Sequence, residues 1–298
     1  MSAMAAGSSV AVITPTYAGD AALCVELNRS LMEHTTGWTH YIVADHRDLG
    51  YFKSLRNDRT VLVAKEELLP PGFRRLPRSR RWLSRYTIRP LGGWLVQQIA
   101  KFASATHFDE EVLVCMDSDV TVFADLHDTD FVRDGRVRLF WLPDGIDAGM
   151  VHHVEWHRSA CRLLGVAPDE PPMPDFIATT VSWSRDVVRG MLARIESVTG
   201  RPWYAAVAAT PQFSEGLTYG AYVQKVLGPD APVWLDPSDR TVNYWDATPL
   251  EPTAVAGLLA TREEGDKLLM ISSHSRTAVP LRRDVAARLA AGEGAAAG

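Results

Sequence analysis

The sequence has few of the features that mark secreted, membrane or nucleic-acid-binding proteins. Its only cysteines are Cys24, Cys115 and Cys161, scattered through 298 residues without a CxxC pair, so neither a disulfide framework nor a zinc knuckle is indicated. No stretch approaches about 18 consecutive apolar residues, the length that a transmembrane helix requires. The formal net charge of -5 argues against a nucleic-acid-binding protein, which usually presents a basic surface.

Several common catalytic signatures are missing too. The chain has no GxSxG, GxxxxGK or GxGxxG motif, which excludes the usual hydrolase, P-loop and dinucleotide-binding sites. His153 and His157 have the spacing of metal ligands on a helix, but the glutamate between them stands one position too late for an HExxH zinc site. A packed amphipathic helix is favoured there, and acceptor recognition by His152 or His157 beside Trp156 is the alternative.

What is present describes a globular protein. The hydrophobic content of 46% is ample for a packed core. Residues 1–9 lack the basic and apolar regions of a secretory signal, so we expect a cytoplasmic location. The small, low-complexity residues at the two ends predict disordered tails at 1–8 and 286–298.

Short apolar runs alternate with helical patterns along the first half of the chain, which is typical of parallel βαβ units. The second half has shorter strands and turns, so a mixed sheet is expected. The predicted strands are 9–14, 41–44, 60–64, 111–116, 137–142, 176–183 and 267–272, and the predicted helices are 21–32, 91–105, 184–198 and a segment within 210–228.

The apolar run that ends at Met116 is followed by Asp117-Ser118-Asp119. Residues two apart in an extended segment project to the same side, so Asp117 and Asp119 are predicted to face one ion while Ser118 points away. Carboxylate oxygens suit Mg²⁺ or Mn²⁺, which commonly bridge a protein to phosphate groups. The motif therefore predicts a phosphate-bearing substrate.

A basic run precedes this motif. Residues 74–89 contain seven arginines interleaved with Trp82 and Tyr86. A solvated loop explains such a run, and countercharge for a diphosphate or an anionic acceptor explains it as well. Both interpretations stay open from the sequence. The arginines are Arg74, Arg75, Arg78, Arg80, Arg81, Arg85 and Arg89.

Three blocks, in a fixed order, give the chain its resemblance to a known family. They are Gly93-Trp94-Leu95-Val96-Gln97-Gln98-Ile99-Ala100-Lys101, Asp117-Ser118-Asp119, and Ser214-Glu215-Gly216-Leu217-Thr218-Tyr219-Gly220. Through them the chain resembles a bacterial branch of the GT-A type glycosyltransferases over about residues 9–245. The resemblance implies an α/β, Rossmann-like GT-A domain with a mixed central sheet flanked by helices. Its donor-binding half would be 9–120 and its acceptor-binding half 121–285.

The resemblance also implies substrates and a cofactor. The donor would be a nucleotide sugar, with UDP- or GDP-sugars favoured, and the acceptor a hydroxyl or amine of a small molecule or glycan. Mn²⁺ or Mg²⁺ would bridge the donor phosphates and stabilise the leaving diphosphate as a Lewis acid. Asp117, Asp119 and His274 would be its ligands, and Arg276 would pair with a phosphate.

The remaining roles also follow from the resemblance. Glu215 would be the general base of an inverting reaction, or would serve acceptor binding in a retaining one; its favourable place at a helix start is the alternative explanation. Trp94, Asp144 and Asp147 would bind the acceptor, although the two aspartates also fit an ordinary turn. Donor contacts would come from Thr14, Pro15, Thr16, Tyr17, Asp45, Gln98, Lys101, Asp117 and Ser118, with strand-end turn chemistry and a polar helix face as the alternatives for several of them.

Two other functions remain open. A nucleotidyltransferase uses similar aspartates, but it typically has a glycine-rich phosphate loop where this chain has Pro15-Thr16-Tyr17. The other alternative is a non-catalytic nucleotide-sugar-binding protein, which would bind the donor without turning it over.

Overall fold

The computed structural model describes residues 9–79 and 81–294. The predicted tail 1–8 lies outside this range, as do Arg80 of the basic run and residues 295–298. Within the described segments, no helix combines the length and the apolar character needed to cross a bilayer.

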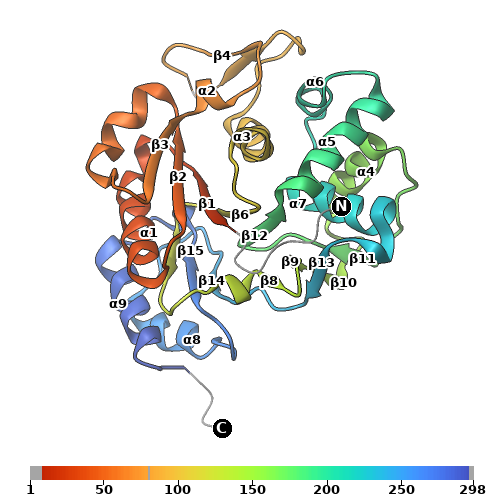
Figure 1. The fold of residues 1–298 in the computed structure, drawn as a ribbon. Helices are drawn as coiled ribbons and strands as arrows, with labels where there is room; N and C mark the ends of the chain where they lie inside the picture. The colour runs from red at the N-terminus through yellow and green to blue at the C-terminus, as the bar shows by residue number, and fades with distance from the viewer. Residues whose placement is uncertain (1–8, 80, 295–298) are drawn as a thin grey trace.

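A five-stranded mixed sheet forms the centre of the molecule (Figure 1). Its order is β12, β6, β1, β2, β3, in which β1 pairs in parallel with β2 and β6, β2 with β3, and β12 runs antiparallel to β6. The predicted parallel units and the mixed central sheet flanked by helices are confirmed. The strands are β1 Val10–Pro15, β2 Thr39–Ala44, β3 Thr60–Ala64, β6 Val112–Met116 and β12 Thr180–Ser184.

The two faces of this sheet are covered by different helices because side chains alternate along each strand. Leu113 and Cys115 of β6 join the core with α3 (Gly93–His107) and α5 (Arg185–Thr199). Val112 and Val114 join a second core with α1 (Ala21–His34). β6 ends at Met116, directly before Asp117.

Smaller sheets lie in the lower and right-hand parts of the molecule in Figure 1, and the hairpin of β4 and β5 lies at its top. The order β14, β15, β7 forms one, β13, β9, β8 another, and β10 with β11 and β4 with β5 form two-stranded ribbons. The strands are β4 Phe73–Arg75, β5 Trp82–Ser84, β7 Val120–Val122, β8 Val132–Arg133, β9 Arg136–Phe140, β10 Leu142–Ile146, β11 Met173–Asp175, β13 Val233–Asp236, β14 Thr241–Tyr244 and β15 Leu268–Ile271. The remaining α-helices are α2 Lys65–Leu68, α4 Val151–Leu164, α6 Trp203–Ala208, α7 Glu215–Tyr222, α8 Val255–Leu259 and α9 Val279–Ala290.

The last of these helices corrects one prediction. A disordered tail from residue 286 is wrong as far as Ala290, because α9 continues to that residue. Val285, Ala286 and Leu289 recur at helical spacing and pack into a core with α8 and β15. Small residues in the sequence concealed this apolar stripe.

Candidate active site

The acidic motif forms a turn between β6 and β7. β6 ends at Met116, and the backbone N–H of Val120 donates to the carbonyl of Asp117 at 3.2 Å. The prediction that Asp117 and Asp119 share one side of an extended segment is therefore wrong, because strand alternation applies only to extended backbone. Ser118 is buried, and its orientation away from an ion stays a prediction. The two carboxylates instead contact different elements.

Asp117 meets a lysine and a glutamate from two other elements. Lys101 of α3 places its Nζ 3.3 Å from Asp117 Oδ1 and 3.1 Å from Glu215 Oε1. The lysine side chain is only 11% exposed, whereas that of Asp117 is 61% exposed. Burial alone would lower the pKa of Lys101, but the charges of Asp117 and Glu215 outweigh it and raise that pKa above its ordinary value. Lys101 is therefore a permanent cation between two carboxylates.

Glu215 is held by its backbone as well as by its side chain. It begins α7, where Ser214 caps the helix by accepting from the N–H of Leu217. The N–H of Glu215 donates to Gln98 Oε1 at 2.8 Å, and Gln98 is itself buried. A carboxylate in the first helical turn is also favoured by the helix dipole. Two residues of α3, Gln98 and Lys101, thus fix the position of Glu215.

Asp119 lies against the turn that follows β15. Its Oδ2 accepts the backbone N–H of Ser273 at 2.7 Å, directly before His274. Arg282 of α9 holds this turn by donating to the carbonyls of Ile271, Ser272 and Thr277. Burial and the neighbouring charge of Asp117 raise the pKa of Asp119. No sequence motif pointed to Ser273 or Arg282, because their role depends on pairing between β7 and β15.

His274 and Arg276 are both exposed on this turn. Within residues 9–79 and 81–294, no group of three His, Cys, Asp or Glu side chains is arranged to hold a metal ion, so Asp117, Asp119 and His274 do not form a preassembled three-residue site. Mg²⁺ and similar ions are often held by one or two carboxylates, with substrate phosphates and water completing the shell. Asp117 and Asp119 fit that kind of site, and the metal remains a prediction.

The predicted nucleotide-binding loop, residues 14–17, is largely buried. Thr14 is buried, and its hydroxyl lies 2.9 Å from Nε2 of the buried His40. Asp45 is buried and forms ion pairs with Lys65 and Arg75. These partners give both side chains structural roles, and their direct contact with a donor stays a prediction. Of the rest of the loop, Pro15 and Thr16 are buried and Tyr17 is partly exposed.

The predicted acceptor residues lie in two places. Trp94, in the first turn of α3, is 48% exposed, and its ring centroid lies 5.5 Å from that of Trp156 on α4. The packed helix predicted around Trp156 is confirmed as α4. Asp144 lies within β10, so the prediction that it forms a turn with Asp147 is wrong; Asp147 alone makes such a turn, accepting the N–H of Gly149 at 2.7 Å.

Three of the predicted site residues lie on one face of α3. Trp94, Gln98 and Lys101 follow the i, i+4, i+7 spacing of a single helix face, and this face leads from the exposed tryptophan to Asp117 and Glu215. Gln97, on the neighbouring position, is partly buried. We call Lys101, Asp117, Asp119 and Glu215 the carboxylate site.

Comparisons with known proteins give one family and two distant structures. A model described as a family of unknown function (DUF6492) matches residues 9–229. The apo structure of the WbbM bifunctional glycosyltransferase is 14% identical over 89% of this chain and 46% of that chain, with a TM-score of 0.47, so this chain spans less than half of that protein. Mouse xyloside xylosyltransferase 1, apo form, is 12% identical over 90% of this chain and 98% of that chain, with a TM-score of 0.49. A search of curated proteins gave no match.

Proposed function

The chain belongs to the family of unknown function DUF6492, and we propose that it is a metal-dependent glycosyltransferase that moves a sugar from a nucleotide sugar to an acceptor hydroxyl or amine. The observation that carries the proposal is the carboxylate site. Three carboxylates from two segments far apart in the chain lie at the end of β6, with Lys101 as the cation that bridges Asp117 and Glu215. Such a concentration of acidic groups beside a sheet end suits a site for a divalent ion and a phosphate ligand.

Asp117 and Asp119 would hold Mn²⁺ or Mg²⁺. When bound, the ion would stabilise the negative charge of the departing nucleoside diphosphate. Asp117 suits this role because its side chain is 61% exposed and can turn toward a ligand. Asp119 suits it because the N–H of Ser273 fixes one oxygen, Oδ2, and orients the carboxylate.

Glu215 would accept the proton of the attacking hydroxyl or amine as the general base. A base must be held within hydrogen-bond reach of the group that it deprotonates. Gln98 and Lys101 hold Glu215 from two sides, which restricts its carboxylate to one region beside Asp117. Lys101 is therefore a positioning residue for the base and for the metal-binding carboxylate together.

Trp94 would form the acceptor side of the site. It lies four residues before Gln98, which corresponds to about 6 Å along the helix axis. Its exposed ring pairs with Trp156, whose indole N–H donates to Gln212 Oε1 at 3.1 Å. Aromatic faces of this kind stack on the apolar faces of sugar rings and of other flat ligands. A glycan or a flat small molecule is the acceptor chemistry that this surface favours.

A donor screen tests the proposal directly. UDP- and GDP-sugars are incubated with the protein and Mn²⁺ or Mg²⁺, and release of the nucleoside diphosphate is measured without an acceptor. Slow donor hydrolysis is expected, and Asp119→Ala should abolish it. Asp246→Ala is the matched control, since Asp246 is exposed and lies outside the carboxylate site.

Each alternative function has its own outcome in this screen. Release of pyrophosphate from a nucleoside triphosphate, with no reaction of any nucleotide sugar, would replace sugar transfer by nucleotidyl transfer. Donor binding without turnover, in the presence of any candidate acceptor, would identify a binding protein. Acceptors that accelerate donor consumption are then found by the mass of the product.

A further inference from the structure

The basic run lies within a segment that is free of acidic residues. Residues 68–108 contain no Asp or Glu, although the whole chain has 36 and its net charge is -5. The same segment contains seven arginines. A solvated surface loop usually mixes both signs of charge, so this separation requires another explanation.

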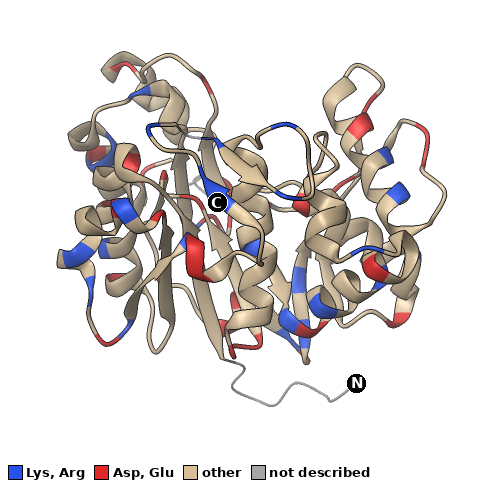
Figure 2. Ribbon diagram, turned by 90° about the horizontal axis from the view of Figure 1, so that it is seen from above, with Lys and Arg blue, Asp and Glu red and all other residues tan. Residues whose placement is uncertain are grey.

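The structure presents most of these arginines on one hairpin. β4 and β5 pair through Phe73 with Ser84 and Arg75 with Trp82. Figure 1 shows the hairpin at the top of the molecule, above α3, and the view from above in Figure 2 shows blue positions along its loops. Among the described residues, no ion pair is formed by the exposed arginines of the hairpin and its flanks, which are Arg74, Arg78, Arg81, Arg85 and Arg89.

The base of the hairpin is firmly attached to the domain. Trp82 is buried, and its backbone exchanges two hydrogen bonds with Leu91, at 3.1 and 2.7 Å. Arg75 forms an ion pair with the buried Asp45, which follows β2. The ring of Tyr86 packs edge-on against Tyr204 of α6, with centroids 5.3 Å apart. The exposed arginines are therefore carried on an anchored scaffold.

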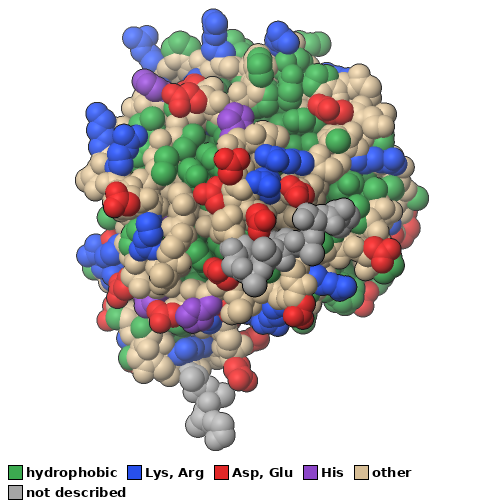
Figure 3. Space-filling view, viewed as in Figure 1, with side chains coloured by type: hydrophobic (Ala, Val, Ile, Leu, Met, Phe, Trp, Pro, Cys, Tyr) green, Lys and Arg blue, Asp and Glu red, His purple; other side chains and the backbone are tan. Residues whose placement is uncertain are grey.

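Apolar side chains stand among the arginines. Ile88 is fully exposed, at 104% of its reference area, and Leu83 is 44% exposed. In Figure 3 basic side chains along the upper edge of the molecule lie beside an area of hydrophobic side chains. We call Leu83, Ile88 and the five exposed arginines the hairpin surface.

We propose that the hairpin surface binds the surface of an anionic lipid bilayer. Arginines near such a surface are attracted by its negative potential, and each contributes to binding over about a Debye length. Exposed apolar side chains beside them can enter the boundary between head groups and acyl chains. This binding would be independent of catalysis, since none of these residues belongs to the carboxylate site.

Ile88 and Leu83 distinguish a bilayer from a soluble polyanion. A soluble polyanion is held by charge alone and offers no apolar phase, so the two aliphatic side chains would gain nothing from it. A bilayer gives both kinds of side chain a partner. The contribution of Ile88 is therefore the quantity that separates the two ligands.

The experiment is cosedimentation of the full chain with lipid vesicles. One set of vesicles is phosphatidylcholine alone, and the other is an equal mixture of phosphatidylcholine and phosphatidylglycerol. We expect binding to the mixed vesicles only, with a steep loss as salt is added. Replacing Arg74, Arg81 and Arg89 by Gln should lower the partition coefficient about a hundredfold, given the contribution expected per basic residue.

Two matched controls keep this result specific. Replacing Arg56, Arg136 and Arg201 by Gln removes the same charge from exposed positions elsewhere and should leave binding within about threefold, because distant charges are screened. Ile88→Ser should lower binding about tenfold or more, as expected for losing the burial of an isoleucine. Val151→Ser, at a site 70% exposed on α4, should change nothing.

Three results would overturn the proposal. Absence of binding to the mixed vesicles at low salt is the first, and an equal loss from the two triple arginine variants is the second. The third is a pair of observations: Ile88→Ser binds the mixed vesicles as tightly as wild type, and dextran sulfate displaces the wild-type protein from them. Together they would identify a soluble polyanion as the ligand of the hairpin surface. Far-UV circular dichroism confirms that each variant is folded, and donor binding is expected to be unchanged in all of them.

Discussion

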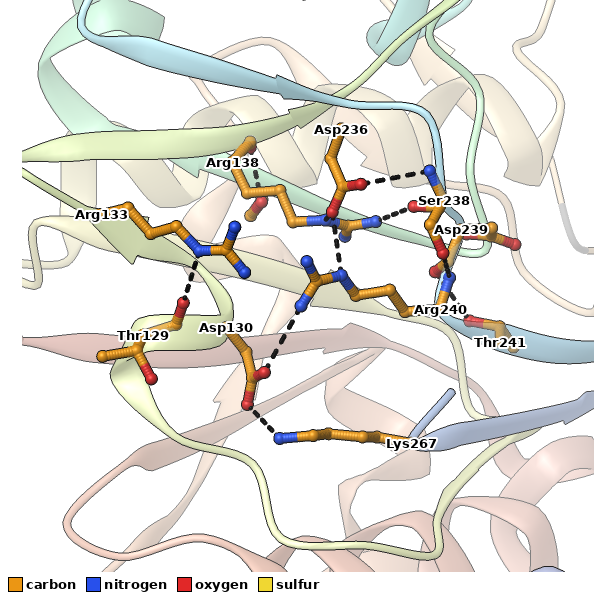
Figure 4. Close-up of polar contacts among 11 residues, drawn as sticks. Thr129, Asp130, Arg133, Arg138, Asp236, Ser238, Asp239, Arg240, Thr241 and Lys267 are labelled. Atoms are coloured by element: carbon orange, nitrogen blue, oxygen red, sulfur yellow. Dashed lines mark hydrogen bonds and ion pairs between the residues drawn. The ribbon is translucent and has the colours of Figure 1, made fainter. Parts of the chain in front are cut away.

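Two clusters of charged residues in this protein differ in how completely their charges are paired. One joins β9, β13 and the ends of β14 and β15, and consists of Asp130, Arg138, Asp236, Arg240 and Lys267; we call it the buried network (Figure 4). Asp236 Oδ2 accepts from both Arg138 and Arg240 at 2.8 Å, while Asp130 contacts Arg240 at 3.4 Å and Lys267 at 2.7 Å. Every charge in this network meets an opposite charge.

The carboxylate site lacks this balance. Lys101 is the cation that contacts both Asp117 and Glu215, and Asp119 receives a backbone N–H from Ser273. Asp117 Oδ1 lies 3.3 Å from the lysine, yet its side chain is mostly exposed. The site thus carries more negative than positive charge at the protein surface.

We interpret this difference as one between structural charges and the charges of the proposed ligand site. In the buried network the protein itself supplies the partners, so the cluster connects strands and needs no ligand. In the carboxylate site the partners are incomplete, as expected if the site binds the cation that we propose for it. The two clusters should therefore respond differently to the same kinds of change.

Arg138→Met should give the largest effect. Arg138 is buried and is shared between Asp236 and the carbonyl of Ser238. Breaking a buried pair from one side leaves an uncompensated charge, so we expect the free energy of unfolding to fall by about 3 kcal/mol. Urea denaturation measures the change. Arg288→Met, which removes an exposed pair with Glu293, is the control and should leave the free energy of unfolding nearly unchanged. Equal losses from the two variants would contradict the structural role of Arg138.

Glu215→Gln should affect turnover and spare stability. The amide keeps the shape of the side chain and its place beside Lys101, but it cannot accept a proton as a base. Turnover should fall by about a hundredfold or more, while donor affinity is retained. Initial rates and donor titration on the same preparation test both parts. A variant with wild-type turnover would remove Glu215 from the mechanism.

Asp236→Asn tests the buried network through pH. Burial would raise the pKa of Asp236, but the hydrogen bond and charge of Arg138 outweigh it and hold the pKa below its ordinary value. A lowered folded-state pKa contributes stability above the unfolded-state pKa, and that stability is lost as the pH falls through the folded-state value. The variant should therefore lose about 2 kcal/mol at neutral pH and progressively less below about pH 4. Urea unfolding at a series of pH values gives the profile, and a loss that stays constant into acid would contradict it.

Asp119→Asn should give the smallest effect, and one of opposite sign. Burial and the nearby charge of Asp117 oppose the charged form of Asp119 in the folded protein. With EDTA present at neutral pH, the variant should be as stable as wild type or more stable by up to about 1 kcal/mol. Asp246→Asn is the control and should change nothing. A clear loss of stability in Asp119→Asn would place this residue with the structural charges.

The sequence predicted the fold through strong, local patterns. The segments that form β1, β3 and β6 are short apolar runs, a pattern that predicts buried strands. The carboxyl ends of parallel strands meet at one edge of a sheet and bring polar residues together there. The acidic motif was identified because it follows such a strand, whereas Lys101 and Glu215 became candidates through the resemblance of their sequence blocks to a known family. That Lys101 bridges the other two could not be read from the sequence, because Glu215 lies 114 residues further along the chain.

The predictions that failed depended on local geometry. The spacing of Asp117 and Asp119 suggested an extended segment, but the chain turns there because β7 pairs back against β15. Thr14 lies in β1 and Asp45 follows β2, and only the structure shows that their side chains contact His40, Lys65 and Arg75. Their contact with a donor stays a prediction. Tertiary partners decide whether a strand-end polar group is available to a ligand.

The most direct test of the account is a calorimetric titration of UDP and GDP into the wild-type protein, with Mn²⁺ and with EDTA. The account predicts that at least one nucleoside diphosphate binds with Mn²⁺, that EDTA weakens this binding by about tenfold or more, and that Asp119→Ala removes the metal-dependent part. Binding that is equally tight in EDTA, or that survives Asp119→Ala unchanged, would contradict it. Failure of both nucleotides to bind with either Mn²⁺ or Mg²⁺ would do so too.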